Sequence, residues 1–215
     1  MKRDLSKPIL YLITPGATTE VTTPDSPEFQ NIIEQVAAAV AAEIDLVQLR
    51  EKRLSGRVLF ELTREAVSVT QGSVTRVLVN DRADIAAGAG AHGVHLTTQS
   101  IDAATVRKTF GNEFVIGVST HSVDEARAAR LAGADFVVFG PVFETASKRE
   151  YGAPVGLPQV ARLTSELANF PVLALGGITT GNARECLHAG AAGIAAISLF
   201  EETTELAELV VKIRR

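Results

Sequence analysis

Residues 76–96 read RVLVNDRADIAAGAGAHGVHL, and this short stretch already contains a complete structural unit. Two short apolar runs, 76–80 and 93–96, flank an alanine-rich segment at 83–89 that has the composition of a helix. Continuous apolar runs are typical of parallel strands buried on both faces, and parallel strands need a crossover connection. The stretch therefore predicts a strand, a helix and a second strand parallel to the first.

The same unit recurs along the whole chain, so that strand candidates alternate with helix candidates. Eight βα units close a parallel barrel, and right-handed crossovers keep every helix outside it. We therefore predict a single-domain (β/α)8 TIM barrel over residues 1–215. The alternative is an open, doubly wound sheet, which would need edge strands more polar than any of these runs. The predicted strands are Ile9–Thr14, Ile44–Leu49, Arg76–Asn80, Gly93–Leu96, Val115–Ser119, Phe136–Gly140, Val172–Gly176 and Gly193–Ser198, and the predicted helices are Glu28–Ala42, Val58–Thr70, Ala83–Ala89, Ala103–Phe110, Val123–Ala132, Leu157–Leu167, Asn182–Ala189 and Leu206–Ile213.

The composition limits the classes of function. A net charge of -4 argues against a nucleic-acid partner, which would require a basic face. The one cysteine, Cys186, cannot form an internal disulfide, and the apolar run near the N-terminus is too short for a signal peptide or a membrane span. We therefore expect a cytoplasmic protein with no membrane partner, and a homo-oligomer stays open.

The strongest site signal follows the second strand, where Gln48, Arg50 and Lys52 alternate at a spacing of two. If the strand continues, all three side chains point into the mouth of the barrel, where two cations are costly unless an anion neutralises them. An arginine beside a lysine favours a phosphate group as that anion. The alternative is that Arg50 or Lys52 pairs with Glu51 or with a neighbouring helix.

Asn80 and Asp81 end the third strand and predict a cation site. A carboxylate next to an amide suits Mg²⁺, which prefers oxygen ligands and keeps several waters. The alternative is that Asp81 caps the helix that follows.

Three later strand ends predict further phosphate contacts. The loop Gly140–Lys148 carries Thr145, Ser147 and Lys148, which suggest a lid over an anion, although the loop could also be merely solvated. Gly177 in the Gly-Gly pair after strand seven, with Ile197 and Ser198 after strand eight, occupies the usual phosphate position of such barrels.

The histidines allow one acid–base role. His121 follows strand five and could transfer protons near neutral pH, or it could only pack or cap a helix. His95 lies within strand four and is expected inside the barrel. The four histidines and the single cysteine lack the spacing of a zinc site.

Six motifs together resemble thiamine phosphate synthase and its thiazole tautomerase relatives, in family order from about residue 9 to residue 200. They are VQLREK (47–52), LVNDRADIAAGAGAHGVHL (78–96), IGVSTHS (116–122), GPVFETASK (140–148), ALGGIT (174–179) and GIAAIS (193–198). The resemblance implies a TIM-barrel transferase that joins a pyrimidine diphosphate to a thiazole phosphate and releases pyrophosphate with the help of Mg²⁺.

The resemblance also implies roles for individual residues. It assigns Asp81 to Mg²⁺ and Ser119 to the diphosphate. The remaining roles are Gln48, Arg50, Lys52 and Asn80 on the pyrimidine diphosphate, Thr145, Ser147 and Lys148 in a flap over both substrates, and Gly177, Ile197 and Ser198 on the thiazole phosphate. Of all these groups, we expect Arg50, Lys52, Ser119 and Lys148, together with His121, to be the catalytic ones.

One position departs from the synthase pattern. The synthases carry a second Mg²⁺-binding aspartate four positions beyond Leu96, where this chain has Ser100, and Asp102 lies two residues too late, at a helix start. The tautomerase relatives commonly lack that aspartate too and would use His121 to move protons on a thiazole carboxylate phosphate. Three alternatives therefore stay open beside the synthase: the tautomerase, a non-catalytic protein that binds thiamine phosphate, and a sugar-phosphate epimerase, which would not explain QLREK and NDR.

Overall fold

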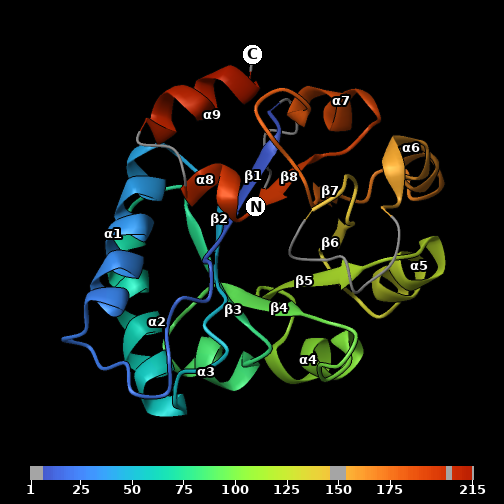
Figure 1. Ribbon diagram of the computed structural model, residues 1–215. Coiled ribbons are helices and arrows are strands. Elements are labelled where there is room, and N and C mark those ends of the chain that lie inside the picture. The colour runs from blue at the N-terminus through green and yellow to red at the C-terminus, as the bar shows by residue number, and fades with distance from the viewer. Residues whose placement is uncertain (1–6, 146–153, 202–204, 215) are drawn as a thin grey trace.

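The computed structural model describes residues 7–145, 154–201 and 205–214. Its parallel strands pair in chain order and close into a barrel, because the last strand pairs with the first (Figure 1). The prediction of a (β/α)8 barrel is confirmed, and the open sheet is excluded because neither terminal strand is an edge. The strands are β1 (Ile9–Ile13), β2 (Leu46–Leu49), β3 (Arg76–Asn80), β4 (Gly93–Leu96), β5 (Val115–Thr120), β6 (Phe136–Phe139), β7 (Val172–Leu175) and β8 (Gly193–Ala196).

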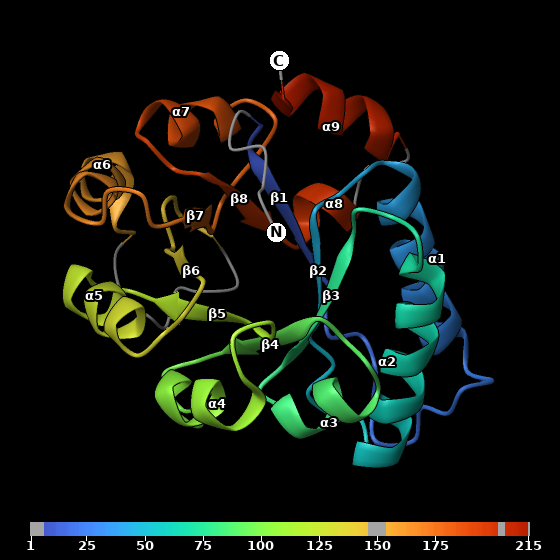
Figure 2. The same cartoon turned by 180° about the vertical axis from the view of Figure 1, so that it is seen from behind.

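Apart from the short α8, the helices form a ring outside the strands, as both views show (Figures 1 and 2). Their predicted ends are correct to within two residues, and one short helix was not predicted. Ser198, expected at a strand end, begins α8, because Phe200 and Glu201 both donate their backbone N–H to the carbonyl of Ile197. The helices are α1 (Pro27–Ala41), α2 (Gly56–Thr70), α3 (Ala83–Gly88), α4 (Ala103–Phe110), α5 (Val123–Leu131), α6 (Gly156–Glu166), α7 (Ala183–His188), α8 (Ser198–Glu201) and α9 (Leu206–Arg214).

Alternation along each strand divides the buried residues into two layers. One set, including Leu10, Val47 and Val79, packs against the helices. The other set, including Tyr11 and Phe136, fills the barrel interior. Since successive side chains point to opposite faces of a strand, the polar residues Gln48, Asn80 and His95 belong to the interior layer, and all three are buried.

The N-terminal ends of the strands are joined by a recurring contact. Residues that precede β2, β4 and β6 accept a backbone N–H from the strand before. Asp45 accepts from Leu10 at 2.9 Å, His92 Nδ1 from Val77 at 3.1 Å and Asp135 from Ile116 at 2.7 Å. Within the described ranges, no helix combines the length and the apolar character needed to cross a bilayer.

Candidate active site

A chain of hydrogen bonds connects β2, β3 and the loop after β4 at the C-terminal mouth of the barrel. Gln48 Nε2 donates to Asn80 Oδ1 at 2.9 Å, and Asn80 Nδ2 donates to Asp81 Oδ2 at 2.7 Å. The hydroxyl of Ser100 donates to the other carboxylate oxygen of Asp81. Asp81 is therefore held by two neutral donors, and its carboxylate forms no ion pair with a described residue.

The other end of this chain carries an unsatisfied acceptor. Gln48 is 2% exposed, and its Oε1 has no hydrogen-bond partner among the residues that the structure describes. An unpaired buried amide oxygen costs about 1–3 kcal/mol. The arrangement is therefore suited to a ligand that donates an N–H or O–H at this point.

The backbone at Asp81 is unusual. Its φ of 61° lies in the left-handed region, which asparagine and aspartate tolerate better than other residues with side chains. The alternative role as a helix cap is wrong, because the N-cap of α3 is Arg82 and no side chain caps that helix. Asp102, in contrast, does cap a helix, since its carboxylate accepts the N–H of Thr105 at the start of α4.

Arg50 and Lys52 lie beyond the end of β2. The strand ends at Leu49, so the expectation that strand alternation continues to Lys52 is wrong. Arg50 is half-buried and Lys52 is exposed in a turn, and neither forms an ion pair with any described residue. The alternative that Glu51 neutralises them is also wrong, because the carboxylate of Glu51 is 2% exposed and bonded elsewhere.

Ser119 projects into the barrel from β5 and meets His95 on β4. The Ser119 hydroxyl and His95 Nε2 lie 2.8 Å apart, and His95 is 2% exposed. The imidazole also packs on the rings of Tyr11 and Phe136, with centroid separations of 5.6 and 6.2 Å. The prediction that His95 lies inside the barrel is confirmed, and its ring fixes the orientation of the Ser119 hydroxyl.

His121 joins the loops after β5 and β6. Its Nδ1 lies 2.6 Å from the carbonyl oxygen of Gly140, which can only accept, so Nδ1 carries a proton. In the neutral ring Nε2 is then the basic nitrogen. The alternative role as a helix cap is wrong, because Ser122 is the N-cap of α5.

The glycine pair after β7 brings two loops into close contact. Val142 N–H donates to the carbonyl of Leu175 at 2.8 Å, and Phe143 N–H donates to that of Gly176 at 3.0 Å. A Cβ on Gly177 would lie 2.6 Å from the carbonyl oxygen of Glu144, and its φ is 64°. Only glycine fits here, because the loop after β6 packs directly against this backbone.

The remaining predicted site residues follow β6 and β8, and only some of them lie among the described residues. Thr145 in the loop after β6 is described, while Ser147 and Lys148 lie outside the described residues. Ile197 packs against the interior cluster, and Ser198 is exposed at the first position of α8. Within the described ranges, no group of three or more His, Cys, Asp or Glu side chains could hold a metal ion.

Two contacts were not predicted: His95 with Ser119, and Ser100 with Asp81. Strand alternation could have found the first, because β4 and β5 pair His95 with Gly117 and Ser119 is the next inward residue. The second joins two loops, and no sequence period reports it.

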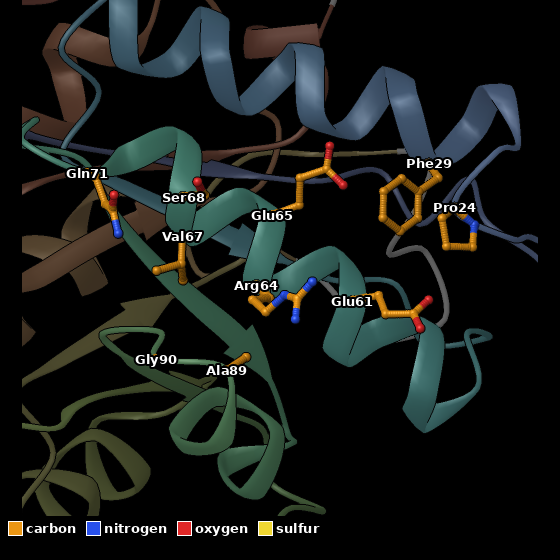
Figure 3. Close-up of a pocket in the computed structure, with 10 residues that line it drawn as sticks. All are labelled: Pro24, Phe29, Glu61, Arg64, Glu65, Val67, Ser68, Gln71, Ala89 and Gly90. Carbon is orange, nitrogen blue, oxygen red and sulfur yellow. The ribbon is translucent and has the colours of Figure 1, made fainter.

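A hollow of about 810 Å³ lies away from all of these residues, outside the barrel. Most of its lining residues belong to α2 and its C-cap, and the others come from α1, from the loop before α1 and from the loop after α3 (Figure 3). None of the predicted site residues borders it, because they lie at or just beyond the C-terminal ends of strands, while the hollow lies between helices. Its lining consists of Pro24, Phe29, Glu61, Arg64, Glu65, Val67, Ser68, Gln71, Ala89 and Gly90.

Known proteins resemble this chain over nearly its whole length. Residues 10–200 match the family described as thiamine monophosphate synthase. A Geobacter sulfurreducens protein, provisionally named a thiamine-phosphate synthase, is 48% identical over 169 residues, 79% of either chain. The thiamine-phosphate synthase of Chlorobium luteolum is 39% identical over 191 residues, which cover 89% of this chain and 84% of the relative. The solved structure of thiamine phosphate pyrophosphorylase from Pyrococcus furiosus superimposes with a TM-score of 0.79 at 28% identity, covering 98% and 99% of the two chains.

Proposed function

This chain belongs to the thiamine monophosphate synthase family, and we propose that it joins a hydroxymethyl aminopyrimidine, as its diphosphate ester, to thiazole phosphate. The products are thiamine phosphate and pyrophosphate, so the protein is a transferase of thiamine biosynthesis. The observation that carries the proposal is that two cations, Arg50 and Lys52, follow the strand that holds Gln48. Neither cation forms an ion pair with a described residue, and the buried Oε1 of Gln48 has no hydrogen-bond partner among the described residues.

The chemistry requires charge neutralisation more than it requires a protein nucleophile. The carbon–oxygen bond between the pyrimidine methylene and the diphosphate breaks, and the thiazole nitrogen takes the vacated position. Arg50 and Lys52 neutralise the departing diphosphate, and groups of this kind act on the charge that develops in the transition state. Ser119, oriented by His95, donates its hydroxyl to a diphosphate oxygen, while Gln48 Oε1 accepts an N–H of the pyrimidine.

The loops after β6, β7 and β8 complete this proposal. We assign the thiazole phosphate to Gly177, Ile197 and Ser198, which follow β7 and β8. We assign the cover over both substrates to Thr145, Ser147 and Lys148, the last of these as a catalytic cation. Asn80 supports the pyrimidine site through its bond to Gln48.

Magnesium fits the residues at Asp81. The candidate metal ligands are both oxygens, the carboxylate of Asp81 and the hydroxyl of Ser100. Mg²⁺ is commonly bound by one or two carboxylates together with substrate phosphates and water. Asp81 would hold the ion, which when bound supplies positive charge to the diphosphate. Changing Ser100 to aspartate adds a second anionic ligand, so Ser100→Asp should lower the Mg²⁺ concentration needed for half-maximal activity, and Asp81→Asn should raise it.

A coupling assay tests the proposed function directly. The purified chain is incubated with both substrates, with and without Mg²⁺, and thiamine phosphate and pyrophosphate are measured. We expect equal amounts of the two products, only when both substrates and the metal ion are present. Full activity in excess chelator would contradict the magnesium role, and no thiamine phosphate under any condition would contradict the function.

A second candidate, thiazole tautomerase, is favoured by two observations. Ser100 stands where the synthases have an aspartate, and the protonated Nδ1 of His121 leaves Nε2 as a base. Loss of tautomerisation in His121→Ala, with no coupling in the parent chain, would establish this candidate instead. Binding of thiamine phosphate without either reaction would indicate a regulator or a carrier. We also propose a cytoplasmic location, and the oligomeric state stays open.

A further inference from the structure

Glu51 lies between the two cations of the site in sequence, yet it contacts neither of them. Its carboxylate binds the loop after β1, where it accepts hydrogen bonds from Thr14 and Thr18 and from the backbone of Gly16. Oε1 accepts from Thr14 Oγ1 at 2.6 Å and from Gly16 N at 3.1 Å, and Oε2 accepts from Thr18 Oγ1 at 2.7 Å and Thr18 N at 3.1 Å. A carboxylate has roughly four acceptor positions, so no position is left for an arginine or a lysine.

The same network reaches the backbone of Arg50. Its N–H donates at 2.8 Å to the hydroxyl of Thr14, which in turn donates to Glu51. Gly16 packs directly on Arg50: a Cβ at residue 16 would lie 3.3 Å from the carbonyl oxygen of Arg50 and 3.7 Å from its Nη1. We call residues 14–18 the β1 loop. This loop packs against Arg50, and the hydrogen bonds of Glu51 hold it at the end of β2.

We propose that Glu51 is a positioning residue for the pyrophosphate site: its buried carboxylate holds the β1 loop in place, so that the loop orients Arg50 and leaves both cations to the ligand. This inference rests on the proposed coupling reaction. A carboxylate at this position would ordinarily neutralise its neighbours. Because Thr14, Gly16 and Thr18 use all of its acceptor positions, the cations keep their charge for an anion instead.

Glu51→Gln tests the role, since it keeps the size of the side chain but places an NH2 group against donors. We expect the affinity for magnesium pyrophosphate, measured by titration calorimetry, to fall about tenfold or more, the equivalent of one or two lost hydrogen bonds. The KM for the pyrimidine diphosphate should rise, while the KM for thiazole phosphate should not change. Thr18→Val, which removes one donor and keeps the shape, should produce a smaller loss in the same direction.

Asp45→Asn is the matched control, because Asp45 precedes β2 just as Glu51 follows it and also accepts a backbone N–H. It should lower the melting temperature and leave pyrophosphate affinity within about twofold of the parent, since it lies at the other end of the strand. Unchanged binding in Glu51→Gln, or an equal loss in Asp45→Asn, would overturn the inference. If Glu51→Gln does not fold, unchanged binding in Thr18→Val overturns it. A parent chain that binds pyrophosphate but does not couple would contradict the proposed function alone.

Discussion

At the N-terminal mouth of the barrel, the acidic side chains Asp45 and Asp135 are each bound by an arginine, with N–O distances of 3.0 Å to Arg214 and 2.7 Å to Arg107. At the C-terminal mouth, Arg50 and Lys52 form no ion pair with any residue in the described ranges, and the carboxylates there accept only neutral donors. Both ends are polar, but among the described residues only the acidic groups of the first are neutralised by ion pairs.

The difference separates stability from function. At the N-terminal mouth Asp45 and Asp135 each pair with an arginine, so this end can hold strands together without a ligand. The C-terminal mouth retains charge and an unsatisfied acceptor at Gln48, which is costly until an anion with N–H donors arrives. Substitutions at the C-terminal mouth should therefore change the coupling rate, whereas substitutions at the N-terminal mouth should change the stability of the fold.

The largest effect is expected from the cations at the C-terminal mouth. Arg50→Ala and Lys52→Ala should each lower the coupling rate by about 10² or more, as for other lost electrostatic donors, because the departing diphosphate is no longer neutralised. Their melting temperatures should stay close to that of the parent chain, since neither side chain forms an ion pair with a described residue. Steady-state kinetics and thermal melts on the same preparations test both statements. Normal coupling in both variants would show that the assigned reaction is wrong.

Arg107 at the opposite mouth should show the reverse pattern. Its guanidinium donates to the carbonyls of Gly111, Phe114 and Gly133 as well as to Asp135. Arg107→Ala should destabilise the fold by at least one charged hydrogen bond, about 1.5–3 kcal/mol, and leave the coupling rate of the folded protein unchanged. Urea unfolding together with kinetics provides the measurement. A loss of coupling without a loss of stability would contradict the division between the mouths.

His92 makes the N-terminal mouth sensitive to pH. Burial, and secondarily the positive charge of Arg76, lower the pKa of His92, whose neutral ring accepts the N–H of Val77. The unfolded chain therefore takes up this proton first, so stability is complete above about pH 6.5 and decreases as the pH falls through the lowered pKa. His92→Gln can accept the same N–H without titrating. Its melting temperature should depend less on pH between about 7 and 5 than that of the parent, and identical pH profiles would exclude His92 as a source.

Tyr11 should show the smallest effect, since it lies between the two mouths. Its ring is fully buried beside His95 and Phe136, its hydroxyl has no hydrogen-bond partner among the described residues, and burial raises its pKa. Tyr11→Phe removes the unsatisfied hydroxyl and should stabilise the protein by up to about 1 kcal/mol, or 2–4 °C. Coupling should change little, and a marked destabilisation would mean that the hydroxyl has a polar partner.

The alternation of apolar runs and alanine-rich segments was sufficient to predict the barrel. Buried parallel strands are apolar along their whole length, so each strand can be recognised from its own residues. Eight strands that alternate with helices are the number that closes a parallel barrel. The polar residues that follow the strands were predictable for the same reason. Gln48, Asn80 and Ser119 are the polar, inward-pointing residues in the last two positions of their strands.

Contacts between loops were decided only by the tertiary structure. The sequence left two alternatives open, that Glu51 pairs with Arg50 or Lys52 and that Asp81 caps the next helix. In the fold, Glu51 binds the β1 loop and Asp81 binds Ser100. The reason is that strand periodicity ends where a strand ends. Beyond that point a side chain pairs with whichever loop the barrel brings beside it, and its partner can stand 33 or 37 positions away in the chain.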